Sequence, residues 1–472
     1  MPSSSLNSNS VHAAAGDRDT DWRPLVTCCL ATFLLLAFTT VVTVSAEPIA
    51  DRLGAGFAVA QWIIDVYTLA LAALVVAMGT LGDRLGHRRL FLLGLITFGV
   101  ASAGCAAATS GGLLVAARAV QGVGGAAIFG TAVPLLTWHY HARARGTAFA
   151  VWGAVAGIGS TVGTIAGGAA TEFISWRWLF LAALPICVVA VITGMRSLSR
   201  DRHATVRLDV PGVALITTMM TGATYAVINA GESGWASPGT IGAAAITVAA
   251  IWSFVQVQRR ATTPLLPPDL FATRGYLAVL VAGFAYYFAA FAVLPVLSRW
   301  LQSSAGMAPL QAALVLTVQL AAFVLVSLVF SARLHEASRS WVLGGGTALT
   351  GLACLSGAAL LLRPDWTSLI AMLIVTGIGA AIVSPVLPAV AATSVPPERA
   401  GVAAAAANAA RQLGLTIGIA LCGTISRAAD TGGGPATGAV VTAVFASGAV
   451  ALCGGAISAM LFRCEAPCNE TG

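Results

Sequence analysis

Three charged residues, Asp65, Arg118 and Arg411, lie inside stretches that are otherwise apolar for about twenty residues, the length of a membrane-crossing helix. A charge inside such a helix is costly, so each one calls for a chemical or structural reason. Asp65 and Arg118 lie at similar depths, about 10 Å and about 8 Å from one end of their helices. A carboxylate beside an arginine that moves can bind and release a proton in turn, so we assign Asp65 and Arg118 to proton coupling. The alternative is a static ion pair that fixes helix packing.

Arg411 lies about 18 Å inside its stretch, too deep for its side chain to reach the membrane surface. We expect it to line a central cavity or to bond an acceptor such as Gln319; an internal hydrogen bond between helices is the neutral alternative. Asn408 precedes it by one helical turn and is a further cavity candidate. Pockets for drug-sized ligands are mostly apolar, although single aromatic side chains in membrane helices more often pack against neighbours or lipid. The aromatic candidates for the cavity wall are Phe38, Trp62, Trp152, Tyr286 and Tyr287.

The elements that would position these residues are membrane-spanning helices. Hydrophobic residues make up 58% of the 472 and charged residues only 9%, which leaves too little polar surface for a soluble protein. The predicted spans are 25–45, 58–79, 90–108, 113–136, 146–168, 178–196, 210–230, 238–257, 275–298, 309–330, 340–362, 367–390, 399–424 and 438–462. We therefore predict an all-α membrane protein of 14 transmembrane helices, in two six-helix bundles with a two-helix insertion between them.

The arginines predict how the chain is oriented. No lysine occurs, and 18 of the 25 arginines fall in loops on the side of the N-terminus, against 5 on the opposite side. This bias indicates that both termini are cytoplasmic. The excess of alanine, glycine and arginine indicates a GC-rich bacterial genome, and hence a multi-pass protein of a bacterial inner membrane. The predicted segments are a disordered tail 1–24, an N-terminal bundle 25–207, an inserted pair 208–258, a C-terminal bundle 259–463 and a tail 464–472.

One loop, between the second and third predicted helices, combines glycines with an acid and arginines. Its notable positions are Gly79, Gly82, Asp83, Arg84, Gly86 and Arg88. Gly79 and Gly82 would let helix ends approach closely, and Gly86 would permit a tight turn. Asp83 could cap the positive N-terminus of a neighbouring helix. We expect this loop to switch between two packing arrangements; an ordinary basic inner loop is the alternative.

The loop resembles the signature inner loop of the major facilitator superfamily. Three other stretches resemble the fourteen-helix drug:proton antiporter branch of that family, around Asp65, around Arg118 and around Arg411. Two positions depart from the branch, since Thr164 stands where proline is usual and Phe38 where the first helix often carries Asp. The fifth helix is similar to the antiporter type in its glycines, which include Gly159, Gly163, Gly167 and Gly168.

The resemblance implies a secondary active transporter that exports drugs, antibiotics or other amphipathic secondary metabolites by alternating access. The proton gradient would supply the energy, so no cofactor is expected, and the partners would be a small-molecule substrate, protons and membrane lipid. A facilitator or importer of a small polar solute is the alternative, and a membrane sensor or enzyme is a third. The loops hold no cluster of catalytic or metal-ligating residues, so we expect no catalytic residue and no metal site. The scattered arginines indicate no nucleic-acid partner.

Overall fold

The computed structural model describes residues 21–199, 209–261, 264–266, 268–361, 366–396, 399–431 and 436–464. Within these residues the chain forms helices and no strands, so the predicted all-α class is confirmed. Most of the two predicted tails, 1–24 and 464–472, lies outside the described residues.

The first half of the chain contains six spans. Its helices are α2 (Arg23–Arg52), α3 (Phe57–Leu85), α4 (His87–Ala107), α5 (Gly111–His139), α6 (Ala142–Phe173), α7 (Trp176–Leu181) and α8 (Ala183–Ser197). The short helix α7 and α8 together make one span, Trp176–Ser197.

Two further spans, α9 (Val210–Ser233) and α10 (Pro238–Arg260), follow in the middle of the chain. They pack against each other, and α9 also contacts α3 and α17. The pair therefore lies against the side of the molecule where α3 meets α17. The exact segment boundaries near 207 and 258 stay predictions.

The second half contains the remaining helices, several of them interrupted. They are η1 (Pro268–Ala272), α11 (Arg274–Ala290), α12 (Leu294–Ser303), α13 (Pro309–Glu336), the π-helical η2 (Ser340–Gly345), α14 (Gly346–Leu360), α15 (Ser368–Val383), α16 (Leu387–Thr393), α17 (Ala400–Thr431) and α18 (Ala436–Arg463). Proline, which lacks the amide hydrogen of a helix interior, explains two of the breaks. Pro295 stands at the start of α12 and Pro388 at the start of α16.

Thirteen helices of the described chain are long and apolar enough to cross a membrane, one fewer than predicted. The remaining predicted span, 399–424, corresponds to α17, which is long enough but less apolar. Asn408, Arg411 and Gln412 lower its hydropathy. Helix α17 contacts α3, α9, α11, α16 and α18, so its polar residues are shielded from lipid by neighbouring helices.

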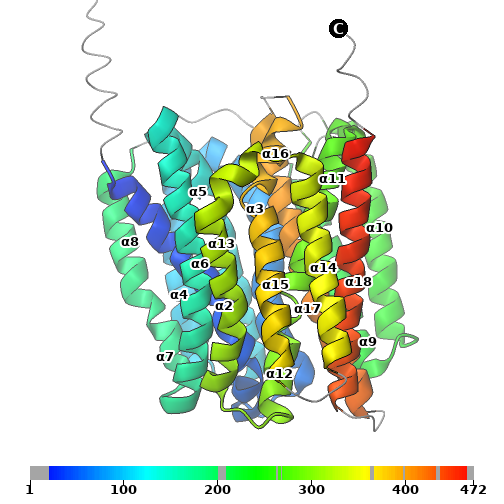
Figure 1. The fold of residues 1–472 in the computed structure, drawn as a ribbon. Coiled ribbons are helices and arrows are strands. Elements are labelled where there is room, and N and C mark those ends of the chain that lie inside the picture. Colours follow the sequence, from blue (N-terminus) through cyan, green and yellow to red (C-terminus); the bar gives the residue numbers. More distant parts are fainter. Residues whose placement is uncertain are drawn as a thin grey trace, which may run out of the picture.

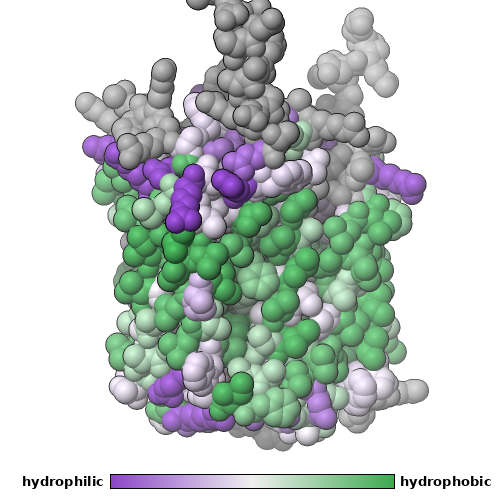
Figure 2. All heavy atoms as spheres, turned by 90° about the vertical axis from the view of Figure 1, so that its left-hand side faces the viewer, coloured by the Kyte–Doolittle hydropathy of each residue, from purple (hydrophilic) through white to green (hydrophobic). Residues whose placement is uncertain are grey.

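The helices stand side by side, and the start of α2 and the end of α18 lie at the same end of the molecule (Figure 1). We call this the terminal end, and we call the opposite end, where α2 connects to α3, the distal end. Figure 2 shows a broad apolar band on the visible face between hydrophilic residues at both ends. Large apolar side chains such as Leu325 and Trp252 are 63% and 66% exposed, as expected of a surface that faces lipid.

Candidate functional site

Helix α3 presents a polar face to α17. Gln61, Asp65 and Thr68 recur at helical spacing and therefore point to the same side. The Gln61 Nε2 atom donates to the carbonyl oxygens of Ile419 (2.9 Å) and Ala420 (3.0 Å). We call this contact, together with the residues below, the α3–α17 seam.

Two further contacts hold the seam closed on either side of Asp65. The Thr416 hydroxyl donates to the Thr68 Oγ1 atom at 3.1 Å, on the terminal side. On the distal side, Gly423 lies so close to the Gln61 amide that a Cβ atom there would overlap it. The seam thus joins the first half of the chain to the second by side-chain and backbone contacts.

Asp65 is enclosed in this seam. Its exposed fraction is 0%, and within the described chain neither carboxylate oxygen has a hydrogen-bond partner. The Oε1 atom of Gln61, one turn away on the same face, is also buried without a donor.

Asp65 and Arg118, for which the sequence allows a direct or water-bridged pair, make no direct contact with each other in the described chain. Arg118 donates to the carbonyl oxygens of Ile63 (3.1 Å) and Phe38 (3.2 Å). It also donates to the Gln121 Oε1 atom at 2.7 Å and lies 4.3 Å over the Tyr67 ring. Because each residue turns a helix by about 100°, Ile63 and Tyr67 lie on one face of α3 and Asp65 on nearly the opposite one. The two charges are at similar depth but on different sides of α3.

The second buried cation, Arg411, meets the tyrosines of α11. Its Nη2 atom donates to the Tyr287 hydroxyl at 2.6 Å, and its guanidinium lies 4.5 Å over the Tyr287 ring and 5.7 Å from the Tyr286 ring. The predicted acceptor Gln319 is not its partner, because Gln319 donates to the Ala290 carbonyl oxygen and accepts from Thr376. The structure thus brings together four of the predicted cavity residues, Tyr286, Tyr287, Asn408 and Arg411.

The other three predicted cavity residues lie elsewhere. The ring of Phe38 packs against Phe98 and Phe180 inside the first bundle, so it does not face the tyrosines of α11. Trp62 lies beside Tyr225 of α9. Trp152 stacks on Phe129, and its indole nitrogen donates to the Thr32 hydroxyl at 2.7 Å. Aromatic side chains that looked alike in the sequence therefore serve helix packing at three different places.

The predicted switch loop joins α3 to α4 at the terminal end. Gly86 has φ of +94°, which confirms the expected turn, and a Cβ atom on Gly82 would overlap the His87 ring. The Asp83 carboxylate lies 3.0 Å from the His87 Nε2 atom, and α4 itself has no side-chain N-cap, so the capping of another helix by Asp83 stays a prediction. Arg88 donates to the Met195 carbonyl oxygen at 2.7 Å and so ties the loop to the end of α8.

Two other positions of the loop make less specific contacts. Gly79 faces the Gly130 backbone of α5 at an ordinary distance, whereas a Cβ atom on Gly130 would meet the Gly79 nitrogen at 2.9 Å. Close approach of α3 and α5 at this point therefore depends on Gly130, whereas a Cβ atom on Gly79 would fit. Arg84 is exposed.

The glycines of α6 let it approach two helices. Gly159, Gly163 and Gly167 face the backbone of α2 at Phe33, Ala37 and Val41, where any Cβ atom would overlap. Gly168 faces α13 instead, where a Cβ atom on it would lie 2.8 Å from the Ala313 Cβ atom. At Thr164, where the antiporter pattern has proline, the hydroxyl donates to the Ser160 carbonyl oxygen and α6 continues unbroken. Helix α6 therefore binds α2 tightly and also contacts the other half of the chain.

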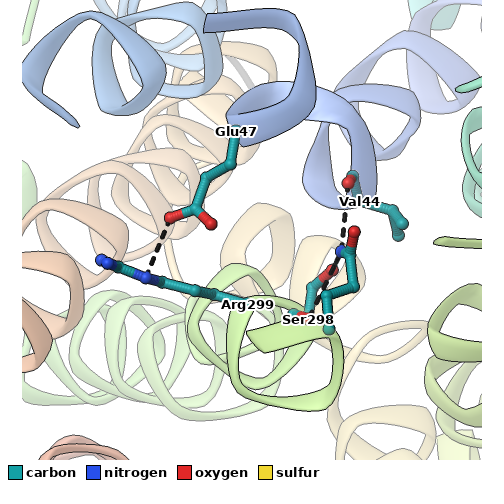
Figure 3. A network of polar contacts seen from close by, with 5 residues as sticks. Val44, Glu47, Ser298 and Arg299 are labelled. Atoms are coloured by element: carbon teal, nitrogen blue, oxygen red, sulfur yellow. Dashed lines mark hydrogen bonds and ion pairs between the residues drawn. The ribbon is translucent and has the colours of Figure 1, made fainter. Parts of the chain in front are cut away.

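At the distal end, contacts that the sequence did not reveal join the two halves. Glu47 of α2 pairs with Arg299 of α12 at 3.1 Å, and the Gln302 amide donates to the Val44 carbonyl oxygen at 3.3 Å (Figure 3). The ring of Phe57, at the start of α3, lies 5.3 Å from the Arg299 guanidinium and 5.0 Å from that of Arg427. We call Glu47, Phe57, Arg299, Gln302 and Arg427 the distal contact set. Most of them line a pocket between the halves that also reaches Gln61.

Two bundles joined along α3–α17 and α6–α13, with charged residues buried between and within them, form the plan of a transporter rather than of an enzyme. The sequence model of the Major Facilitator Superfamily matches residues 28–268 and 279–471, most of the chain. The chain belongs to the major facilitator superfamily. It is therefore a multi-pass membrane transporter of this superfamily and not an enzyme.

Named members of the superfamily are similar over most of their length. The puromycin resistance protein of Streptomyces alboniger is 35% identical over 431 residues, which cover 88% of this chain and 84% of that protein. The cephamycin export protein of Amycolatopsis lactamdurans is 34% identical over 428 residues, which cover 87% of this chain and 86% of that protein.

A solved structure of the superfamily shares the fold. The crystal structure of a peptide transporter in complex with sulfate matches with a TM-score of 0.67 over 93% of this chain and 95% of that one. Its sequence identity of 15% makes it a likeness of fold alone. The predicted major facilitator fold is thus confirmed.

Proposed function

We propose that this transporter exports amphipathic small organic molecules, of the antibiotic or secondary-metabolite kind, in exchange for protons. Export is supported by the relatives that are named for antibiotic resistance and for antibiotic export. These names favour export over the facilitator or importer that the sequence left open. The partners are the organic substrate and protons, no cofactor takes part, and the arginine bias supports cytoplasmic termini in a bacterial cell membrane.

The observation that carries proton coupling is the enclosure of Asp65 in the α3–α17 seam without a partner. An unpaired carboxylate charge in such a place costs several kcal/mol, so Asp65 is stable there as the neutral acid. The neutral acid also carries the hydroxyl donor that the Gln61 Oε1 atom lacks. Protonation of Asp65 therefore stabilises the closed form of the seam.

The transport cycle follows from this linkage. Opening the seam exposes Asp65 to water, where the carboxylate ionises freely, and closing it without bound substrate requires a proton. If the distal end faces outside, Asp65 takes its proton there when Gln61 leaves the Ile419 and Ala420 carbonyl oxygens. The opposite opening then releases the proton to the cytoplasm. The seam then closes again with substrate bound in place of the proton, so that the proton gradient drives export.

Arg118 has a different role in this proposal. Its contacts lie on the other face of α3, to α2 through Phe38 and to α3 through Ile63. It holds α3 in the rotation that presents Asp65 to α17. We therefore assign proton binding to Asp65 alone and helix positioning to Arg118.

The test uses Asp65→Asn in everted membrane vesicles with an imposed pH gradient, and a cephamycin, which carries a carboxylate, as the transported probe. We expect the wild-type protein to accumulate the cephamycin in a protonophore-sensitive manner and Asp65→Asn to lose at least about 90% of this activity. The matched control is Asp51→Asn, because Asp51 is exposed at the end of α2. Gradient-driven transport by Asp65→Asn at the wild-type rate would refute the proton-binding role.

A further inference from the structure

The guanidinium of Arg411 carries a charge that no described carboxylate neutralises. The ion pairs of the described chain involve other residues, and the Arg411 Nε atom is buried without an acceptor. Its one strong polar contact is with the neutral Tyr287 hydroxyl. Tyrosine rings stabilise a cation by about 1 to 2 kcal/mol each, less than the cost of holding an unpaired charge among membrane helices.

Hydrogen-bond donors outnumber acceptors among Arg411, Asn408 and Tyr287, because the acceptors are only the Asn408 Oδ1 and Tyr287 hydroxyl oxygens. The Asn408 Nδ2 atom, on the same face of α17, is buried without an acceptor among the described residues. The Tyr287 hydroxyl accepts from Arg411 and so keeps its own proton to donate. Donors buried without acceptors are costly, and this group of three has a surplus of them. The group is short of acceptors, and a negatively charged acceptor would suit it best.

The group lies where the two bundles meet. Tyr287 and the neighbouring Phe291 pack against hydrophobic clusters of both halves of the chain. Tyr287, Asn408 and Arg411 are only partly buried as whole residues, although α17 is surrounded by other helices. Aromatic rings adjoin them, since Phe291 lies 4.9 Å from Tyr287 and 6.1 Å from Phe323. Charged donors beside an aromatic wall suit a molecule with one anionic end and one apolar body.

We propose that Tyr287, Asn408 and Arg411 bind the anionic group of the substrate, a carboxylate or an equivalent oxyanion, while Phe291 and Phe323 contact its apolar part. An arginine guanidinium binds a carboxylate by two parallel hydrogen bonds, which gives both strength and orientation. The proposal rests on the proposed function for the direction of transport and names the substrate class. It makes amphipathic organic anions the preferred cargo.

A matched pair of fluorescent probes tests the proposal without a proton gradient. Dansylglycine carries a carboxylate, and dansylglycinamide has a neutral amide at the same place. We expect the wild-type protein in lipid nanodiscs to bind dansylglycine at least about tenfold more tightly than dansylglycinamide. Binding is measured by energy transfer from tryptophan to the dansyl group. Equal binding of the two probes, or weaker or absent binding of dansylglycine, would overturn the proposal.

Variants test whether the preference for dansylglycine over dansylglycinamide arises at Tyr287, Asn408 and Arg411, which we call the anion subsite. Arg411→Gln should lower dansylglycine affinity to that of the amide and leave dansylglycinamide within about twofold, whereas Arg411→Lys should keep part of the preference. The control Arg333→Gln removes an exposed arginine near the terminal end and should change neither affinity. An unchanged preference in Arg411→Gln would place the anion elsewhere and refute the assignment.

Failure of the anion subsite can be distinguished from failure of the proposed proton-coupled export. Asp65→Asn should still prefer dansylglycine, because the seam and the subsite involve different residues. Loss of the probe preference with intact gradient-driven export would refute the anion subsite alone. Intact preference with gradient-independent export would refute proton coupling alone.

Discussion

At the scale of single residues, the buried charges differ in how their environment satisfies them. Arg118 is surrounded by acceptors, with two carbonyl oxygens, the Gln121 side chain and the Tyr67 ring around one guanidinium. Asp65 has no partner in the described chain. A charge that is fully satisfied stabilises one structure, whereas a group without a partner is stable only if it can change its protonation or its surroundings.

This difference makes a prediction for Arg118→Met. The substitution removes three hydrogen bonds from a charged donor and leaves the buried Gln121 Oε1 atom without a donor, so it should lower the stability of the first bundle by about 3 kcal/mol. We expect the melting temperature of the purified protein in detergent to fall by several degrees, measured by intrinsic fluorescence. A variant that melts like the wild type but has lost gradient-driven export would instead return Arg118 to proton coupling. Gln121→Met, which removes one of the acceptors, should show a smaller decrease.

The sequence predicted well how deep each charged residue lies along its helix, but poorly which neighbouring helix its side chain faces. Apolar runs located the spans because lipid requires about twenty apolar residues, and Gly86 marked a real positive-φ turn. Asp65 and Arg118 were placed at the same level, but the contact between them depended on helix rotation, which depth does not determine. The predicted contact between Gln319 and Arg411 was wrong for the same reason, because the packing of α11 on α17 determines which residue Arg411 contacts.

At the scale of helices, the α3–α17 seam is lined by polar side chains, but the two helices come this close only because Gly423 has no side chain. The spacing of Gln61, Asp65 and Thr68 at one face was visible in the sequence and could have pointed to a partner helix. What was not visible was the partner, because α17 is more than three hundred residues away in the chain. Long-range pairing of this kind follows from the tertiary fold.

Gly423→Ala should loosen the seam. Its methyl group would displace the Gln61 amide from the Ile419 and Ala420 carbonyl oxygens, so the distal side should open more often. The readout is labelling of the buried Cys422 by a membrane-impermeant maleimide, in a background with Cys453, Cys464 and Cys468 changed to Ser. We expect labelling to accelerate about fivefold or more, since about 1 kcal/mol shifts an equilibrium by that factor.

The matched control for this experiment is Gly153→Ala. Gly153 is an α6 glycine with open space around its Cβ position, so its substitution should leave Cys422 labelling unchanged. Equal labelling of Cys422 in Gly423→Ala and in the parent protein would show that Gln61 does not hold the seam closed.

At the scale of the whole molecule, the halves are joined at the distal end by the distal contact set and along two seams (Figures 1 and 3). Opening the distal end requires Glu47 to leave Arg299 and Phe57 to leave two arginines. Each of these contacts is individually weak, about 1 kcal/mol or less in a partly exposed place. The set can therefore close the distal end without preventing its opening.

A reversible cross-link tests whether this opening is required. In a variant with Glu47→Cys and Arg299→Cys, a short reducible bis-methanethiosulfonate should join the halves. The reagent would span the gap that the Glu47 and Arg299 side chains span in the wild-type protein. We expect export to stop after cross-linking and to recover after reduction, with no effect of the reagent on either single variant. Full export by the cross-linked protein would exclude opening at the distal end.

The glycine face of α6 also has a consequence for how such a transporter can diversify under antibiotic selection. The backbones of α2 and α6 touch at three successive turns with no room for a single methyl group, so variants there are lost whatever the drug. Tyr287 and Phe291 are themselves only partly enclosed and can change size or polarity without parting two helices. Resistance to new compounds should therefore arise by replacement beside α11, while the α2–α6 contact is inherited unchanged.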